Sequence, residues 1–133
     1  MISMNTRKPA DLLALHGGSI VDYVCDEPCP IEKPSRIKVA AKEPSATLEA
    51  KYSDIDINGH VNSIRYIEHI LDLFPIELYK KSRIRRFEMA YVAESYYGDV
   101  LTFYKDDAGD GVYEIEVKKN AGEVVCRSKV IFC

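Results

Sequence analysis

Residues 52–62 concentrate polar side chains that could do chemistry. Carboxylates, amides and an imidazole recur there at every second position: Asp54, Asp56, Asn58, His60 and Asn62. Carboxylates and imidazoles can accept or donate protons, and an amide can donate a hydrogen bond to an oxygen that gains negative charge. Helical apolar spacing follows directly, so the segment is predicted to cross from a strand into a helix. Three interpretations compete for it.

The first interpretation is a calcium-binding loop. Residues 54–59 match the D-x-D-x-N-G pattern, and Val61 supplies the apolar eighth position. The twelfth position should supply a bidentate glutamate, but it holds Arg65, a cation. The incoming element also looks like a strand instead of a helix. Both features disfavour calcium.

The second interpretation is an ordinary turn before a helix. Asn58 or Asn62 would cap the helix, and Gly59 would relieve a tight turn. This interpretation does not explain why His60 follows directly, nor why the polar groups recur at every second position.

The third interpretation is an active site. Free N–H groups at the start of a helix favour an oxygen that gains negative charge, such as a carbonyl oxygen under attack. A nearby imidazole and carboxylates could activate water. The predicted chemistry is therefore acyl transfer to water, which is hydrolysis.

The elements that must position this segment follow from hydrophobic periodicity. Residues 47–52 alternate weakly and predict a strand. Residues 62–74 carry apolar side chains at spacings of three and four, which predicts a largely buried helix: Ile64, Ile67, Ile70, Leu71 and Phe74. Pro75 ends this helix or opens a short helical turn through Lys80.

The rest of the chain alternates with a period of two. This pattern predicts strands around residues 83–94, 101–103, 113–117 and 126–132, separated by turns rich in Gly, Asp and Asn. We expect a meander of long antiparallel strands in a sheet that wraps around one long central helix. The fold class is α+β.

Composition sets outer limits on function. The chain has 133 residues, 47% of them hydrophobic, and a formal net charge of -3. These values suit one globular domain and disfavour general nucleic-acid binding. There is no apolar run of about 18 residues and no signal-peptide core, so we expect a cytoplasmic protein.

The cysteines and histidines do not suggest a metal site. The cysteines lack the C-x2-C spacing of a zinc ribbon: Cys25, Cys29, Cys126 and Cys133. In a reducing compartment we expect free thiols. His16 and His69 read as packed or surface side chains without metal partners.

Two stretches of the chain resemble a known family. Residues 54–68 closely resemble the D-x-D-x-N-x-H-V-N-N-x-x-Y-x-x-W/E signature of acyl-acyl-carrier-protein (acyl-ACP) thioesterases. Residues 91–99 resemble its second signature, a strand ending in Glu followed by Cys or Ser and a Gly-Asp turn. The resemblance implies the hotdog fold and release of fatty acid from acyl carrier protein, with no metal or organic cofactor.

By position, the resemblance assigns four catalytic residues: Asp56, Asn58, His60 and Glu94. We expect His60 and Glu94 to position or deprotonate water, and Asp56 to orient its neighbours. Asn58 and nearby backbone N–H groups would hold the thioester carbonyl. These backbone groups are those of Gly59, His60 and Val61.

Ser95 departs from the plant pattern and remains a candidate site residue. Plant members carry a cysteine there that was once proposed as the nucleophile. A serine at this position puts a covalent cysteine mechanism in doubt, so attack by water is favoured.

The first 45 residues look like a linker. They hold five of the six prolines and show no sustained period, which places the predicted boundary near Pro44. Family members typically carry two hotdog domains in tandem, and the second bears these motifs. We interpret residues 1–45 as a remnant of a preceding domain, with 1–13 resembling its last strand, followed by the interdomain linker. Residues 46–133 are the expected hotdog thioesterase domain, paired as a homodimer or with a missing N-terminal hotdog.

Five cations cluster in an otherwise acidic chain: Lys80, Lys81, Arg83, Arg85 and Arg86. They could dock the acidic acyl carrier protein and the phosphate of its phosphopantetheine arm. They could equally form a solvated turn. Two functional alternatives also stay open, an acyl-coenzyme A thioesterase and a catalytically incomplete half-domain.

Overall fold

The chain divides into two compact units in a computed structural model that describes residues 11, 13–120 and 122–133. They are Met1–Lys33 and Pro34–Cys133. The described part of the first unit holds a 3-10 helix, η1 (Leu15–Tyr23). The predicted resemblance of residues 1–13 to a strand falls mostly on residues 1–10 and 12, which lie outside the described residues. Within the described ranges, no helix is long and apolar enough to cross a membrane.

Two short helices follow one another in the second unit. Helix α1 (Ser63–Leu71) begins after Asn62, whose side chain accepts a hydrogen bond from the N–H of Ile64 at 2.9 Å. Helix α2 (Ile76–Lys81) begins directly after Pro75, as the sequence predicts. α1 is shorter than the expected helix over 62–74, because the chain leaves the α conformation before Pro75.

The buried face of α1 differs from the predicted one. Tyr66 and Ile70 are buried on the helix, and Phe74 is buried just beyond it. Ile64, expected on the same face, is 55% exposed. The prediction of a largely buried helix is therefore only partly right.

Five antiparallel strands form one sheet in the order β1-β3-β4-β5-β2. They are β1 (Ala46–Glu49), β2 (Ile84–Tyr91), β3 (Val100–Gly109), β4 (Val112–Lys119) and β5 (Glu123–Phe132). The predicted strands are confirmed, but only β3, β4 and β5 form a meander. β2 pairs with β5 at the opposite edge of the sheet from β1.

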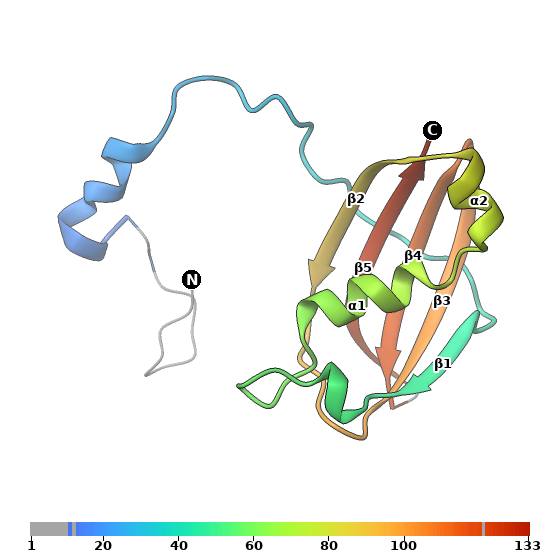
Figure 1. The fold of residues 1–133 in the computed structure, drawn as a ribbon. Coiled ribbons are helices and arrows are strands. Elements are labelled where there is room, and N and C mark those ends of the chain that lie inside the picture. The colour runs from blue at the N-terminus through green and yellow to red at the C-terminus, as the bar shows by residue number, and fades with distance from the viewer. Residues whose placement is uncertain (1–10, 12, 121) are drawn as a thin grey trace. The chain divides into compact units, whose positions relative to one another are not determined.

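Helix α1 crosses one face of this sheet (Figure 1). Side chains of β3, β4 and β5 pack there with those of α1 in one core: Phe103, Ile115, Val117, Val130, Phe132 and Ile70. The sheet thus packs one face against α1, and this central helix has only nine residues, fewer than the long helix expected.

Residues 34–45 run along the other face of the sheet (Figure 1). The N–H of Ser35 donates to Glu88 on β2 at 3.0 Å, and the N–H of Ala40 donates to Asp106 on β3 at 3.0 Å. Ile37 is buried between these two contacts along the chain. This segment, which we call the strap, packs on the sheet. The assignment of residues 1–45 to a preceding domain and linker stays a prediction.

Candidate active site

A closed loop joins the 3-10 helix η2 (Tyr52–Asp54) to α1. An antiparallel bridge pairs Ile55 with Val61 at its base. Gly59 takes a φ of +80°, the left-handed conformation that glycine adopts without strain, and turns the chain back. The loop is therefore not a strand, although its polar residues alternate like one.

Asp56 organises this loop. Its Oδ1 accepts hydrogen bonds from the N–H groups of Asn58 at 2.8 Å and His60 at 3.2 Å. Burial acts to raise the pKa of Asp56, but these bonds, the Asn58 side chain and the charge of His60 outweigh it and lower that pKa. Asp56 is thus ionised at neutral pH and has the geometry of an orienting residue.

His60 and Glu94 meet across the chain. The bridge between His60 and Tyr96 brings the loop beside the segment that follows β2. His60 Nε2 then lies 3.4 Å from Glu94 Oε2, and the Tyr96 hydroxyl donates to the same carboxylate oxygen at 3.2 Å. The side chains of His60 and Glu94 are 24% and 54% exposed, so solvent reaches the pair.

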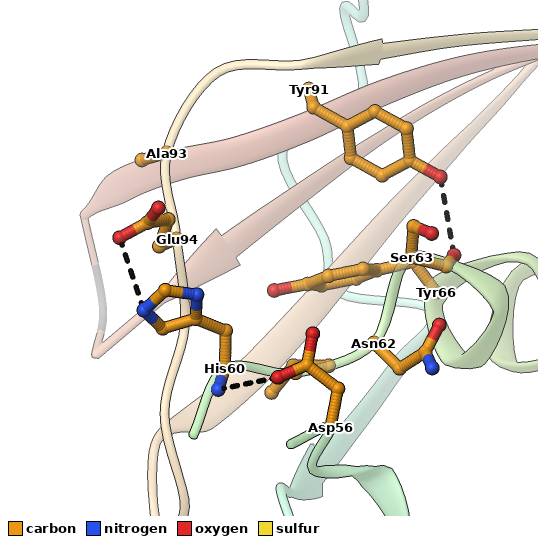
Figure 2. A pocket seen from close by; sticks show the side chains of 9 residues that line it. Asp56, His60, Asn62, Ser63, Tyr66, Tyr91, Ala93 and Glu94 are labelled. Atoms are coloured by element: carbon orange, nitrogen blue, oxygen red, sulfur yellow. Dashed lines mark hydrogen bonds and ion pairs between the residues drawn. The ribbon is translucent and has the colours of Figure 1, made fainter. Parts of the chain in front are cut away.

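The pair borders a pocket of about 260 Å³ at the start of α1 (Figure 2). The lining comes from the loop, α1 and the end of β2: Asp56, His60, Val61, Asn62, Ser63, Tyr66, Tyr91, Ala93 and Glu94. Three of the four predicted catalytic residues therefore share one pocket. Asn58 lies exposed near the loop tip, outside the lining.

The three backbone N–H groups predicted to hold the carbonyl are already engaged. Those of Gly59 and His60 donate to Asp56, to its carbonyl oxygen at 3.0 Å and its Oδ1 at 3.2 Å. That of Val61 donates to the carbonyl oxygen of Ser95 at 2.8 Å. In the loop as folded, these bonds occupy the three N–H groups and hold the loop closed, and the role of these groups as carbonyl donors stays a prediction.

Ser95 is buried and does not line the pocket. Its hydroxyl lies close to that of Tyr66 inside the core, although neither makes a hydrogen bond of regular geometry with a described residue. Burial raises the pKa of Tyr66 to about 12. A nucleophilic role for Ser95 therefore has no support in this geometry.

The predicted cation cluster spans the end of α2 and the start of β2. Its lysines and its first two arginines are exposed, whereas Arg86 is half-buried and pairs with Glu88. From Arg85 to Tyr91, six residues of strand cover about 20 Å. The cluster therefore lies well away from the pocket.

Sequence reasoning missed two contacts that support the site. Asp54, buried at the end of η2, meets His69 of α1, with Oδ1 and Nε2 3.0 Å apart. Lys119 donates to the backbone carbonyl of Glu94 at 2.6 Å. His69 lies three residues after the buried Tyr66, and that spacing could have shown that it faces inward.

The described residues show no metal centre. No three His, Cys, Asp or Glu side chains in them come together as ligands. Arg65, at the twelfth position of the calcium-like pattern, pairs with Glu68 and donates to the carbonyl oxygen of Ser53.

Comparison with known proteins decides the family. The acyl-ACP thioesterase C-terminal domain profile matches residues 37–132. The chain belongs to this family. It is similar to the dodecanoyl-[acyl-carrier-protein] hydrolase of Cinnamomum camphora, with 28% identity over 107 residues, 75% of this chain and 28% of that protein. The predicted family is confirmed.

Solved structures of acyl-ACP thioesterases agree on the fold. One from Bacteroides thetaiotaomicron has 75% identity and a TM-score of 0.90, and the match covers 99% of this chain and 53% of that one. The 12:0-ACP thioesterase from Umbellularia californica has 18% identity and a TM-score of 0.73, covering 99% and 52%. The predicted hotdog fold is confirmed. The chain spans about half the length of these solved thioesterases and less than a third of the plant relative.

Proposed function

We propose that this chain hydrolyses the thioester of fatty acyl-ACP and releases the free fatty acid. The observation that carries this proposal is the His60–Glu94 pair, 3.4 Å apart, on the wall of a pocket at the start of α1. Membership of the acyl-ACP thioesterase family and the 75% identical Bacteroides thioesterase support the substrate class.

The proposed reaction is a direct attack by water. His60 accepts a proton from the water as its oxygen bonds to the thioester carbonyl carbon, and Glu94 stabilises the imidazolium that forms. The tetrahedral oxyanion then collapses, and the carbon–sulfur bond breaks. His60 returns the proton to the leaving thiolate, so the products are a carboxylic acid and a thiol. Asp56 holds the His60 backbone in place.

The oxyanion needs donors outside the closed loop. Ser63, the first residue of α1, lines the pocket. The next two N–H groups, those of Ile64 and Arg65, donate to Asn62, so the Ser63 N–H is the proposed donor at the helix terminus. Asn58 keeps its proposed role as a second donor if the loop tip turns inward over the substrate. Replacing Asn58 with Ala would then cut kcat about 100-fold. A wild-type kcat in the folded variant would leave the helix terminus as the donor.

The proposal includes a second hotdog domain as partner, either a copy of this chain or another domain. In support, β2 lies at an edge of the sheet among the described strands, and an open strand edge is a pairing surface. Exposed aromatic side chains, Tyr91 and Tyr97, lie at and just after its end. Sedimentation equilibrium of the purified chain tests the homodimer.

The exposed cations of α2 and β2 are proposed to dock the carrier protein. A site about 20 Å from the pocket suits a substrate whose thioester stands at the end of a long arm. Charge reversal of Lys80, Lys81, Arg83 and Arg85 should raise KM for acyl-ACP but leave KM for short acyl-pantetheine thioesters unchanged. An unchanged KM for acyl-ACP would contradict docking at this surface.

The experiment that tests the function is hydrolysis of matched acyl chains on acyl carrier protein and on coenzyme A. The purified chain is compared with His60→Ala, and the folding of both is checked by circular dichroism. Turnover of acyl-ACP that the variant loses supports the proposal. Preference for coenzyme A would favour the acyl-coenzyme A alternative. Inactivity of the folded chain with every substrate would favour an incomplete half-domain.

A further inference from the structure

A buried contact joins the two sides of the catalytic loop. The Asp54 side chain is 9% exposed, and its Oδ2 accepts a hydrogen bond from the N–H of Lys51 at 2.7 Å. Its Oδ1 lies 3.0 Å from His69 Nε2. The His69 ring also packs edge-on against Phe103 of β3, with ring centres 6.3 Å apart. Both partners are therefore fixed by neighbours other than each other.

Asp54 also closes the base of the loop through its backbone. Its carbonyl oxygen accepts the N–H of Asn62 at 2.8 Å, directly beside the bridge between Ile55 and Val61. Asp54 precedes the loop, and His69 lies on the helix that follows it. The side-chain contact thus ties the start of the loop to α1, while the backbone contact ties it to the end of the loop.

Stability alone does not explain such a pair. A buried polar pair of this kind is often no more stabilising than apolar side chains of the same volume. Its position matters more, because the loop that it anchors holds His60 against Glu94. Misplacement of a catalytic group by about 1 Å can lower a rate about 100-fold.

We propose that Asp54 and His69 form a positioning pair. The pair holds the loop formed by residues 55–61 against α1, so that the His60 imidazole faces Glu94. This inference rests on the proposed function for its effect on turnover. Neither residue lines the pocket, so the pair acts through the loop and not on the substrate.

The test compares His69→Leu with His69→Gln. Leucine fills the space but leaves Asp54 Oδ1 without a donor, whereas the glutamine amide can still donate to it. We expect His69→Leu to lower kcat about 100-fold, with KM for acyl-ACP unchanged. His69→Gln should recover most of the lost kcat. Asp54→Asn is the matched change on the other side of the contact, and it should behave like His69→Leu if the carboxylate is required.

A second readout does not depend on turnover. The chain has three histidines, so the His60 imidazole signals can be assigned in NMR spectra by their loss in His60→Ala. In folded His69→Leu, the His60 signals should shift, and in His69→Gln they should return toward the wild-type position. Wild-type His60 signals and wild-type kcat in His69→Leu would overturn the positioning pair. Equal losses of kcat in His69→Leu and His69→Gln would overturn it as well.

The two proposals fail in different ways. If the wild-type chain hydrolyses no thioester, the proposed function fails, while the His60 signals still decide whether the pair positions His60. If the wild-type chain is active and His60→Ala is not, an active His69→Leu variant overturns the positioning pair alone.

Discussion

The substitution Glu94→Gln separates catalysis from stability at the His60–Glu94 pair. It removes the negative charge and keeps the size of the side chain. The Glu94 side chain is 54% exposed and lies 3.4 Å from His60 Nε2. Exposed ion pairs contribute about 0–1 kcal/mol to stability. A loss of that size lowers the Tm of a domain this large by at most about 8 °C.

The expected effect on turnover is far larger. Proton transfer by a positioned side chain contributes about 10²–10⁴-fold to rate. This range corresponds to about 3–5 kcal/mol of activation free energy. Without the carboxylate, the imidazolium formed during attack loses an anion 3.4 Å from its Nε2. We therefore expect Glu94→Gln to lower kcat at least about 100-fold while the protein stays folded.

The matched control is Glu49→Gln. Glu49 makes a comparable exposed pair, 3.0 Å from Lys51 Nζ, and it does not line the pocket. Steady-state release of fatty acid from acyl-ACP, quantified by mass spectrometry, gives kcat for both variants, and differential scanning fluorimetry gives Tm. A wild-type kcat in Glu94→Gln would refute the reasoning. An equal loss in Glu49→Gln would refute it too, because the effect would then follow from charge alone.

Three further outcomes are expected. Cys126 is fully buried, and burial raises its pKa to about 12. Ellman's reagent should therefore label the three exposed cysteines in the native protein, whereas it should label Cys126 only after denaturation. Burial acts to raise the pKa of Glu88, but hydrogen bonds from Ser35 and Arg86 lower it below its ordinary 4.5. The stability that Glu88 contributes is thus present above pH 4.5 and lost as the pH falls through the lower folded value, and urea unfolding of Glu88→Gln should show a weaker acid dependence. Ile37 of the strap is only 8% exposed, so Ile37→Ala should lower the free energy of unfolding, measured by urea titration, by about 2 kcal/mol.

Periodicity predicted the elements of the fold better than their arrangement. Alternation with a period of two reports which face of a strand is buried, and the observed strands bear that out. It does not report which strand lies next to which. β2 lies beside β5, at the end of the sheet away from β1. The local sequence pattern could not predict this pairing. Helical spacing likewise placed Ile64 on the buried face, because spacing alone cannot show where the sheet stops covering the first turn of α1.

The motif pointed to residues that share a pocket and left their hydrogen bonds undetermined. Asp56 and His60 both line the pocket, and their catalytic roles stay predictions. The N–H groups expected to bind the carbonyl instead close the loop. Those of Gly59 and His60 donate to Asp56, and only that of Val61 depends on a residue distant in sequence, through the carbonyl oxygen of Ser95. His69 was set aside because a lone histidine has no metal partner. Its partner is Asp54, 15 positions earlier, and only the packing of η2 against α1 brings the two together.

Asp56, Asn58 and His60 are evenly spaced in the sequence, but they do not share one position in the structure. Alternate residues of a strand share one face, but these three residues do not lie in a strand. The left-handed Gly59 turns the chain between Asn58 and His60, and Asp56 accepts hydrogen bonds from both of their N–H groups. As a result, His60 lines the pocket and Asn58 stays at the exposed loop tip. A role for Asn58 in catalysis therefore requires motion of the tip, whereas the proposed role of His60 requires none.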